Sequence, residues 1–125
     1  MVKGRKITGG KYKSLRKKKK FSLSGKERKV KLRQTKKKTI RGIGGNKKTV
    51  LLSAEFANII NIETKKAKKV KILNVLETPS NRFLARQNIL VKGAIIKTEL
   101  GDAKITNRPS QEGSVQAILL KEIKE

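Results

Sequence analysis

The positive charge of this 125-residue chain is concentrated in its first two fifths. The stretch from Lys3 to Lys48 holds 21 of the 34 lysines and arginines but only one of the nine acids, Glu27. Its net charge is therefore +20, against +25 for the whole chain. A segment with so much like charge repels itself and does not stay compact alone. We therefore expect a dense polyanion as its partner, and nucleic acid is the first candidate.

The apolar residues follow the opposite distribution. Eleven hydrophobic residues lie among the first 48 positions and 33 lie from Thr49 onward. Only the second part has the apolar content of an ordinary globular domain. The sequence thus predicts a basic, glycine-containing extension over residues 1–48 and a core domain over residues 49–125. We expect the core domain to fold without the extension.

The sequence contains neither cysteine nor histidine. Disulfides, thiol nucleophiles and the commonest metal ligand and general base are therefore excluded. Among the carboxylates after residue 48, Glu99 and Asp102 are near neighbours across a predicted tight turn. We expect no enzyme activity, cofactor, metal site or small-molecule substrate. No apolar run approaches the ~20 residues that span a bilayer, and no apolar signal-peptide core follows the basic N-terminus, so we expect a cytoplasmic protein without a membrane partner.

Two glycine-containing segments and two aromatic residues stand out in the extension. Residues 5–11 (RKITGGK) place a glycine pair among cations, where glycine either lets the backbone approach a phosphate or marks a flexible loop. Residues 39–48 (TIRGIGGNKK) predict a turn, and no helix follows them as a P-loop requires. Tyr12 and Phe21 could stack on bases, but we expect each to pack on the core domain. Lys29 to Arg33 alternates basic and apolar residues, which fits a short strand or an extended strip along RNA.

From Thr49 onward, short apolar segments alternate with polar turns, a pattern typical of β-strands. The first apolar run covers residues 49–62. It permits a helix, but we favour a strand, with its even positions Val50, Leu52, Ala54 and Phe56 on one face. Further strands are predicted over residues 68–78, 93–99, 103–107 and 114–123, with turns or loops at 79–81, 100–102 and 109–113 and a strand or helical turn at 82–88. Five or six short strands predict an all-β fold, a small barrel-like antiparallel domain.

Several segments resemble a known family. Residues 5–11 resemble the signature of the archaeal and eukaryotic small-subunit ribosomal protein family S-eight-e, which is unrelated to the bacterial protein of similar name. Residues 39–48 resemble its second basic motif, although Ile43 stands where eukaryotic relatives have arginine. Three further segments resemble the β-domain pattern of this family: Pro79-Ser80-Asn81, Leu84-Ala85-Arg86 and Leu90-Val91-Lys92. The motifs recur in order over nearly the whole chain, which lacks the long insertion of eukaryotic members and so resembles the shorter archaeal form.

The resemblance implies a structural constituent of the small ribosomal subunit that binds ribosomal RNA and lies among neighbouring ribosomal proteins. The alternatives are a ribosome-assembly factor, a DNA-compacting or other non-catalytic nucleic-acid-binding protein, and an enzyme acting on RNA. The residues predicted to bind RNA are the cations and loop residues Lys3, Arg5, Lys6, Gly9, Gly10, Lys11, Lys13, Arg16, Lys17, Lys18, Lys19, Lys20, Arg28, Lys29, Lys31, Arg33, Lys36, Lys37, Lys38, Arg41, Gly44, Gly45, Asn46, Lys47 and Lys48.

Overall fold

The computed structural model describes residues 4–12, 17–23 and 25–120. In chain order its elements are η1 (Lys20–Ser22), β1 (Lys31–Leu32), β2 (Lys36–Arg41), η2 (Ile43–Gly45), β3 (Lys47–Ala54), β4 (Phe56–Ile60), β5 (Ala67–Glu77), α1 (Arg82–Arg86), β6 (Ile95–Thr98), β7 (Gly101–Ile105) and β8 (Gln116–Leu119). The predicted all-β fold is confirmed, because α1 is the one α-helix in the described ranges and has five residues.

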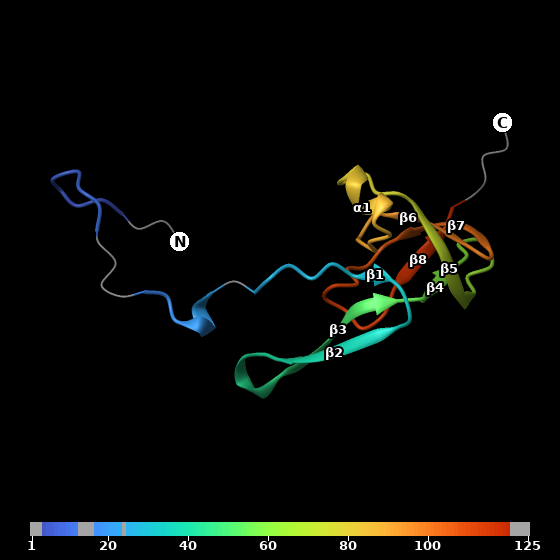
Figure 1. Ribbon diagram of the computed structural model, residues 1–125, viewed down its shortest axis with the longest axis horizontal. Coiled ribbons are helices and arrows are strands. Elements are labelled where there is room, and N and C mark those ends of the chain that lie inside the picture. Colours follow the sequence, from blue (N-terminus) through green and yellow to red (C-terminus); the bar gives the residue numbers. More distant parts are fainter. Residues whose placement is uncertain (1–3, 13–16, 24, 121–125) are drawn as a thin grey trace.

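Strands β4 to β8 form a closed barrel in sequence order (Figure 1). Each barrel strand pairs antiparallel with the next, whereas the closing pair, β4 with β8, is parallel. The antiparallel expectation therefore fails at one place. In a five-stranded meander the first and last strands run in the same direction, so the closing pair must be parallel. Closure also removes the free edges that an open sheet exposes.

The barrel interior is filled by alternate residues of the strands, except on β5, where the inward row shifts between Ile72 and Val75 at an irregularity in the pairing with β6. On β4, Ala57 and Ile59 are buried, whereas their neighbours Phe56, Asn58 and Ile60 are exposed. This period of two follows from the pleat of a strand. The core cluster is completed by inward residues of the other strands and of the segments between them, including Val70, Ile72, Val75, Leu90, Ala94, Ile96, Ala103, Ile105, Val115 and Ala117.

The predicted first strand is in fact two strands, because the chain bends at Glu55 between β3 and β4. Val50 and Ala54 of the expected face are buried, but Leu52 between them is only half-buried, and Leu51 on the opposite face is 1% exposed. Phe56, by contrast, is 40% exposed. The prediction that Phe56 shares a face with Val50 is wrong, because the bend resets the alternation and places Phe56 in the outward row of β4.

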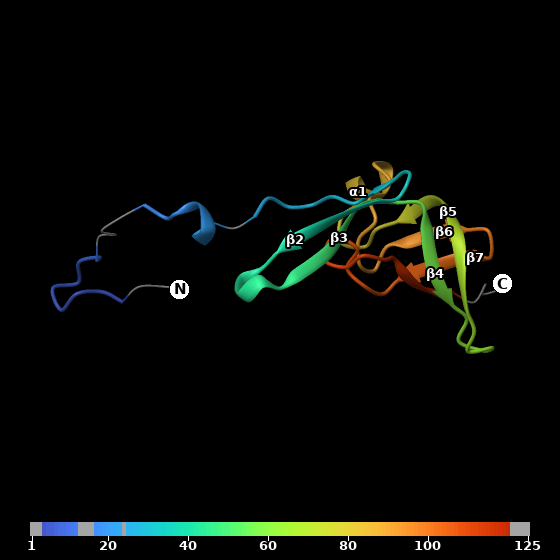
Figure 2. The ribbon, with the colours of Figure 1, turned by 90° about the horizontal axis from the view of Figure 1, so that it is seen from below.

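A smaller sheet with the strand order β1–β3–β2 lies beside the barrel. β2 and β3 form an antiparallel hairpin that projects from the barrel (Figures 1 and 2). β1 pairs parallel with β3, which confirms the short strand suggested by the alternation in residues 29–33. Val30, just before β1, is 1% exposed and belongs to the core cluster. Its carbonyl accepts a hydrogen bond from Leu90 N at 2.8 Å, so a piece of the basic extension is packed into the core.

The remaining predicted elements are found with small shifts. β5 matches the strand predicted at 68–78, and β6 and β7 form the predicted hairpin. The connector predicted at 82–88 contains the helix α1, which is capped by Asn81: the Asn81 side chain accepts a hydrogen bond from Phe83 N at 3.0 Å. Asparagine is a favoured residue at this capping position. The strand predicted at 114–123 is the shorter β8, and residues 121–123 lie outside the described part of the chain.

Candidate nucleic-acid interface

The basic cluster most firmly positioned by the fold lies on the β2–β3 hairpin. Its register places Arg41 opposite Lys47, Thr39 opposite Thr49, and Lys37 opposite Leu51. Directly opposite residues of an antiparallel pair project on the same face, as do residues two apart on one strand. The residues Lys37, Thr39, Arg41, Lys47 and Thr49 therefore form one exposed surface, called here the hairpin face.

Like charges directly opposite each other destabilise a β-sheet, and Arg41 and Lys47 are such a pair. Within the described residues, neither of them has a carboxylate within 4.0 Å. The other face carries Lys38 and Lys48, and the Lys48 ammonium donates a hydrogen bond to Gln111 Oε1 of the loop beside the barrel. The hairpin face thus presents uncompensated positive charge on a paired backbone, an arrangement that favours an external anion.

The tip of the hairpin depends on two glycines. Gly44 and Gly45 have φ values of 71° and 78°, a left-handed conformation that side chains disfavour. A Cβ atom at Gly45 would meet nothing within 4 Å, so backbone conformation rather than space requires glycine there. Gly42 N donates to Asn46 O at 2.6 Å and closes the turn. The predicted turn is confirmed, and it brings Arg41 and Lys47 together.

The N-terminal segment over residues 5–11 also folds into a tight turn. Lys6 N donates to Gly10 O at 2.9 Å, and Gly9 N donates to Lys6 O at 2.8 Å. Gly9 has a φ of 78°, so this glycine serves the turn. Arg5 and Lys11 are bridged across it, and both are exposed. The turn therefore gathers three cations, those of residues 5, 6 and 11, within one short segment.

The two aromatic residues of the extension are exposed. Tyr12 is 56% and Phe21 is 83% exposed, so the prediction that each packs on the core domain is wrong. Each ring lies near an ammonium group instead, with Lys6 Nζ 5.8 Å from the Tyr12 ring centre and Lys19 Nζ 6.0 Å from that of Phe21. The residues on either side of Tyr12 and Phe21 in the sequence are lysines or serine, which offer the rings no apolar surface to pack against. The rings therefore remain exposed.

The other residues predicted to bind RNA occupy different positions. Arg28 is partly buried, and its Nε donates to Ser110 O at 3.1 Å, so this side chain also fastens the chain to the barrel. Three exposed cations that follow Arg28 in the sequence also lie beside the barrel: Lys29, Lys31 and Arg33. The exposed cations at 17–20 lie away from the barrel, around η1 (Figure 1). The predicted residues Lys3, Lys13 and Arg16 lie outside the described residues.

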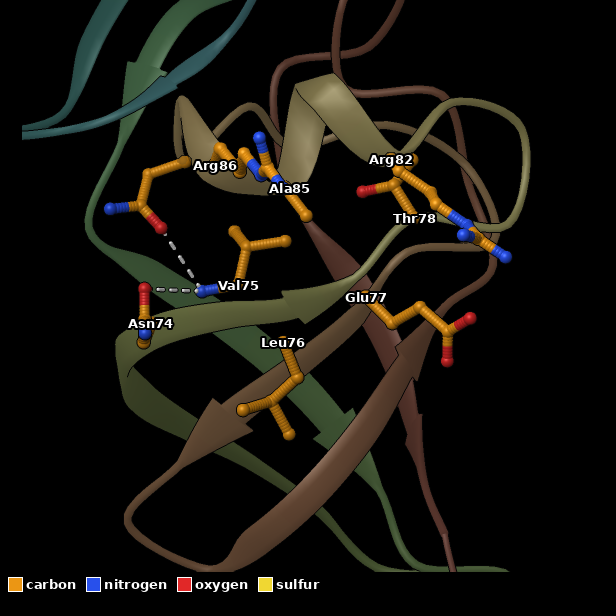
Figure 3. A pocket seen from close by; sticks show the side chains of 9 residues that line it. Asn74, Val75, Leu76, Glu77, Thr78, Arg82, Ala85 and Arg86 are labelled. Atoms are coloured by element: carbon orange, nitrogen blue, oxygen red, sulfur yellow. Dashed lines mark hydrogen bonds between the residues drawn. The ribbon is translucent and has the colours of Figure 1, made fainter.

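Sequence reasoning assigned no binding residue to the barrel, yet the structure forms pockets there. Figure 3 shows one of about 650 Å³ between α1 and the end of β5. Arg82 and Arg86 line it from α1, one helical turn apart, and Glu77 lines it from β5. The buried hydroxyl of Thr78 has no hydrogen-bond partner among the described residues. The sequence indicated only that Arg82 and Arg86 are four residues apart and so lie on one side of a helix. The pocket itself forms because the end of β5 packs beside α1.

Metal and membrane chemistry find no support in the described ranges. There, no group of three or more acidic side chains is placed to hold a metal ion. The helices of the same ranges include none that is long and apolar enough to cross a membrane.

A sequence model of the family described as Ribosomal protein S8e matches residues 2–120. The chain belongs to the ribosomal protein S8e family. Three relatives are each named Small ribosomal subunit protein eS8. The protein of Sulfurisphaera tokodaii is 50% identical over 119 residues, that of Sulfolobus acidocaldarius 48% over 120, and that of Methanococcus aeolicus 47% over 119. Each match covers 94% of this chain and 93% of the relative.

Membership of S8e confirms the resemblance carried by residues 5–11 and 39–48. The relatives are archaeal, and the near-complete coverage on both sides confirms the similarity to the short archaeal form. In this S8e chain both motifs fold into glycine-containing turns that gather cations. The β-domain pattern at residues 79–92 forms α1, its capping turn and a strand-like segment next to Val30.

Proposed function

We propose that this S8e chain is a structural constituent of the small ribosomal subunit in the cytoplasm and that it binds ribosomal RNA through its basic residues 1–48. Its partners are small-subunit ribosomal RNA and neighbouring ribosomal proteins, and its role includes no catalytic step. The observation that carries the proposal is the hairpin face, where Arg41 and Lys47 lie opposite each other without a carboxylate. A polyanion relieves that repulsion, and the family makes ribosomal RNA the polyanion of choice.

The two parts of the chain have complementary roles in this proposal. The extension over residues 1–48 neutralises phosphates, and affinity comes mainly from the release of counterions. The core domain over residues 49–125 anchors the hairpin, so Lys47 and Lys48 lose less conformational entropy on binding than cations in an unpaired segment. Recognition then rests on the shape of folded RNA rather than on base edges in a deep, narrow groove.

The test of the proposal is the sedimentation of the protein in a native lysate. We expect it to co-migrate with mature small subunits and to stay with them after a wash in moderate salt. Co-migration only with precursor particles would support the ribosome-assembly factor instead. A position in the free fraction, or with DNA, would contradict the proposal.

We expect single substitutions at the hairpin tip to weaken RNA binding more than single substitutions in the lysine runs. Arg41→Lys keeps the charge but loses the planar fork that grips a phosphate through two hydrogen bonds. Gly45→Val keeps the charge but disfavours the positive φ at the tip. We expect each variant to bind a small-subunit RNA fragment roughly 5- to 30-fold more weakly. Lys19→Ala, in an exposed lysine run, should have a smaller effect. Filter binding or fluorescence anisotropy at fixed salt measures all three.

Matched controls separate binding from folding at the tip. Arg41→Lys should leave the melting temperature unchanged, because the side chain is exposed. Gly45→Asn should retain more affinity than Gly45→Val, since asparagine tolerates the left-handed region. If Arg41→Lys binds like the parent and Gly45→Val fails only because it unfolds, the tip is a structural turn and the extension acts as an undifferentiated polycation.

A further inference from the structure

The outer face of the barrel presents an aromatic ring among cations. Phe56 and Asn58 point outward from β4, and the register places Lys71 and Lys69 opposite them on β5. Lys69 Nζ lies 4.9 Å from the centre of the Phe56 ring. Phe56 is the first residue of β4 and is 40% exposed, so it contributes little to the core and its ring is accessible from solvent.

A pocket of about 370 Å³ lies between this ring and the base of the hairpin. Phe56, Asn58 and Lys69 line it from the barrel, and Lys37 and Leu51 line it from the hairpin. Lys37 and Leu51 are directly opposite each other and belong to the same row as Arg41 and Lys47. The hairpin face therefore continues into the pocket, so one extended ligand could follow both.

The charges that line this pocket are both positive, since its charged side chains in the described residues are Lys37 and Lys69. The nearest carboxylate in the sequence, Glu55, pairs with Lys71 at 3.1 Å. The pocket thus combines an aromatic face, two cations and the carboxamide of Asn58. Proteins hold single-stranded nucleic acid with this combination, by stacking bases on aromatic rings along a positively charged groove.

We propose that this pocket binds an unpaired nucleotide of the RNA, with its base stacked on Phe56 and its phosphate between Lys37 and Lys69. The inference rests on the proposed function and adds a ligand class to it. The ligand is an unstacked nucleotide that adjoins the RNA segment bound along the hairpin face. The ammonium of Lys69 sits on a flexible stem, so it swings from the ring to the phosphate when the base arrives. Asn58 supplies a donor and an acceptor for the edge of the base.

The alternative occupant, an acidic peptide of a neighbouring protein, fits less well. Lys37 and Lys69 would accept its carboxylates, but an acidic peptide gains little from the flat aromatic ring of Phe56. A nucleotide uses the ring, the carboxamide and both cations together. An oligo-glutamate peptide therefore serves as the competitor in the test.

The test compares Phe56→Leu with Phe83→Leu in the full chain. Phe83 is 67% exposed on α1 and does not line this pocket, which makes it a matched control. The probes are a single-stranded hexa-adenylate carrying 2-aminopurine and a blunt-ended two-stranded RNA duplex without unpaired bases. We expect Phe56→Leu to weaken binding of the single strand by about 5- to 100-fold and to abolish quenching of the 2-aminopurine. Duplex binding should change little, and Phe83→Leu should behave like the parent.

Salt titration and folding controls make the outcome decisive. Phe56→Leu should leave the slope of log affinity against log salt unchanged, whereas Lys37→Gln and Lys69→Gln should each reduce it by about 1. Both leucine variants should melt like the parent, because both rings are exposed, and Phe56→Trp should keep the affinity.

If the parent binds with a steep salt slope and Phe56→Leu binds equally well, the pocket assignment is overturned and the proposed function stands. If the parent shows no salt-dependent RNA binding, the proposed function fails as well. Phe56-dependent binding of oligo-glutamate at the affinity of the single strand would assign the pocket to a protein partner.

Discussion

The affinity of this protein for a small-subunit RNA fragment is expected to fall by about 10⁴- to 10⁵-fold when the salt concentration is raised from about 50 to about 200 mM. If about ten cations of the extension meet phosphates, the slope of log affinity against log salt is roughly −7 to −9. The structure supports contacts of this kind, because the described cations from residue 4 to residue 48 are exposed apart from the partly buried Arg28. Their charges are therefore available to an external polyanion.

Binding measured at four or more salt concentrations checks this prediction. A variant with Lys17, Lys18, Lys19 and Lys20 replaced by glutamine should show a slope shallower by up to about 4, because each lost phosphate contact removes about one unit. A parent slope shallower than about −3 would contradict the prediction and would mean that the extension is not the main contact. Gel filtration of both proteins at each salt concentration excludes aggregation as a cause.

Val30→Ala is expected to lower the free energy of unfolding by about 2 kcal/mol, a large fraction of the stability of a small domain. Val30 is 1% exposed and lies in the same core cluster as Leu90, although it belongs to the basic part of the sequence. Removal of two buried methyl groups loses their transfer free energy and leaves a cavity. Urea unfolding followed by circular dichroism measures the change through the midpoint at constant m-value.

Ile43→Ala is the matched control for this stability effect. Ile43 is 95% exposed at the hairpin tip, so its truncation should change stability by less than about 0.5 kcal/mol. A fragment of residues 49–125 keeps all five barrel strands, and we expect it to melt cooperatively. It loses Val30 and both partners of β3, so it should be less stable than a fragment that starts at residue 26. Equal stability of the two fragments, with Val30→Ala like the parent, would contradict the role given to Val30.

The candidate nucleic-acid interface could be predicted from the sequence only where its conformation depends on the preferences of neighbouring residues. The turn at residues 42–46 was predictable because glycine and asparagine favour left-handed backbone and turns. The strand β2 was not, because a lysine run has no apolar alternation, and Lys36 to Lys38 become a strand only by pairing with β3. The same pairing selects which cations share a face with Arg41.

Phe56 shows a different limit of sequence reasoning. Alternation along one continuous strand placed it with Val50, on the buried side. The bend at Glu55 inverts that assignment, and a bend forced by the passage of the chain from one sheet to the barrel leaves no clear local signal. The only hint in the sequence was that Ala57 and Ile59 fit an inward row better than Phe56 and Asn58 do.

The sequence by itself determined the all-β class, the segregation of charge and the membership of S8e, because periodicity, net charge and short motifs are properties of neighbouring residues. Only the tertiary structure decided that Val30 lies in the core, that Arg41 faces Lys47 and that Phe56 borders a basic pocket. Each of these depends on contacts between distant segments, such as Val30 with Leu90, whose energies come from burial and strand register rather than from local preference.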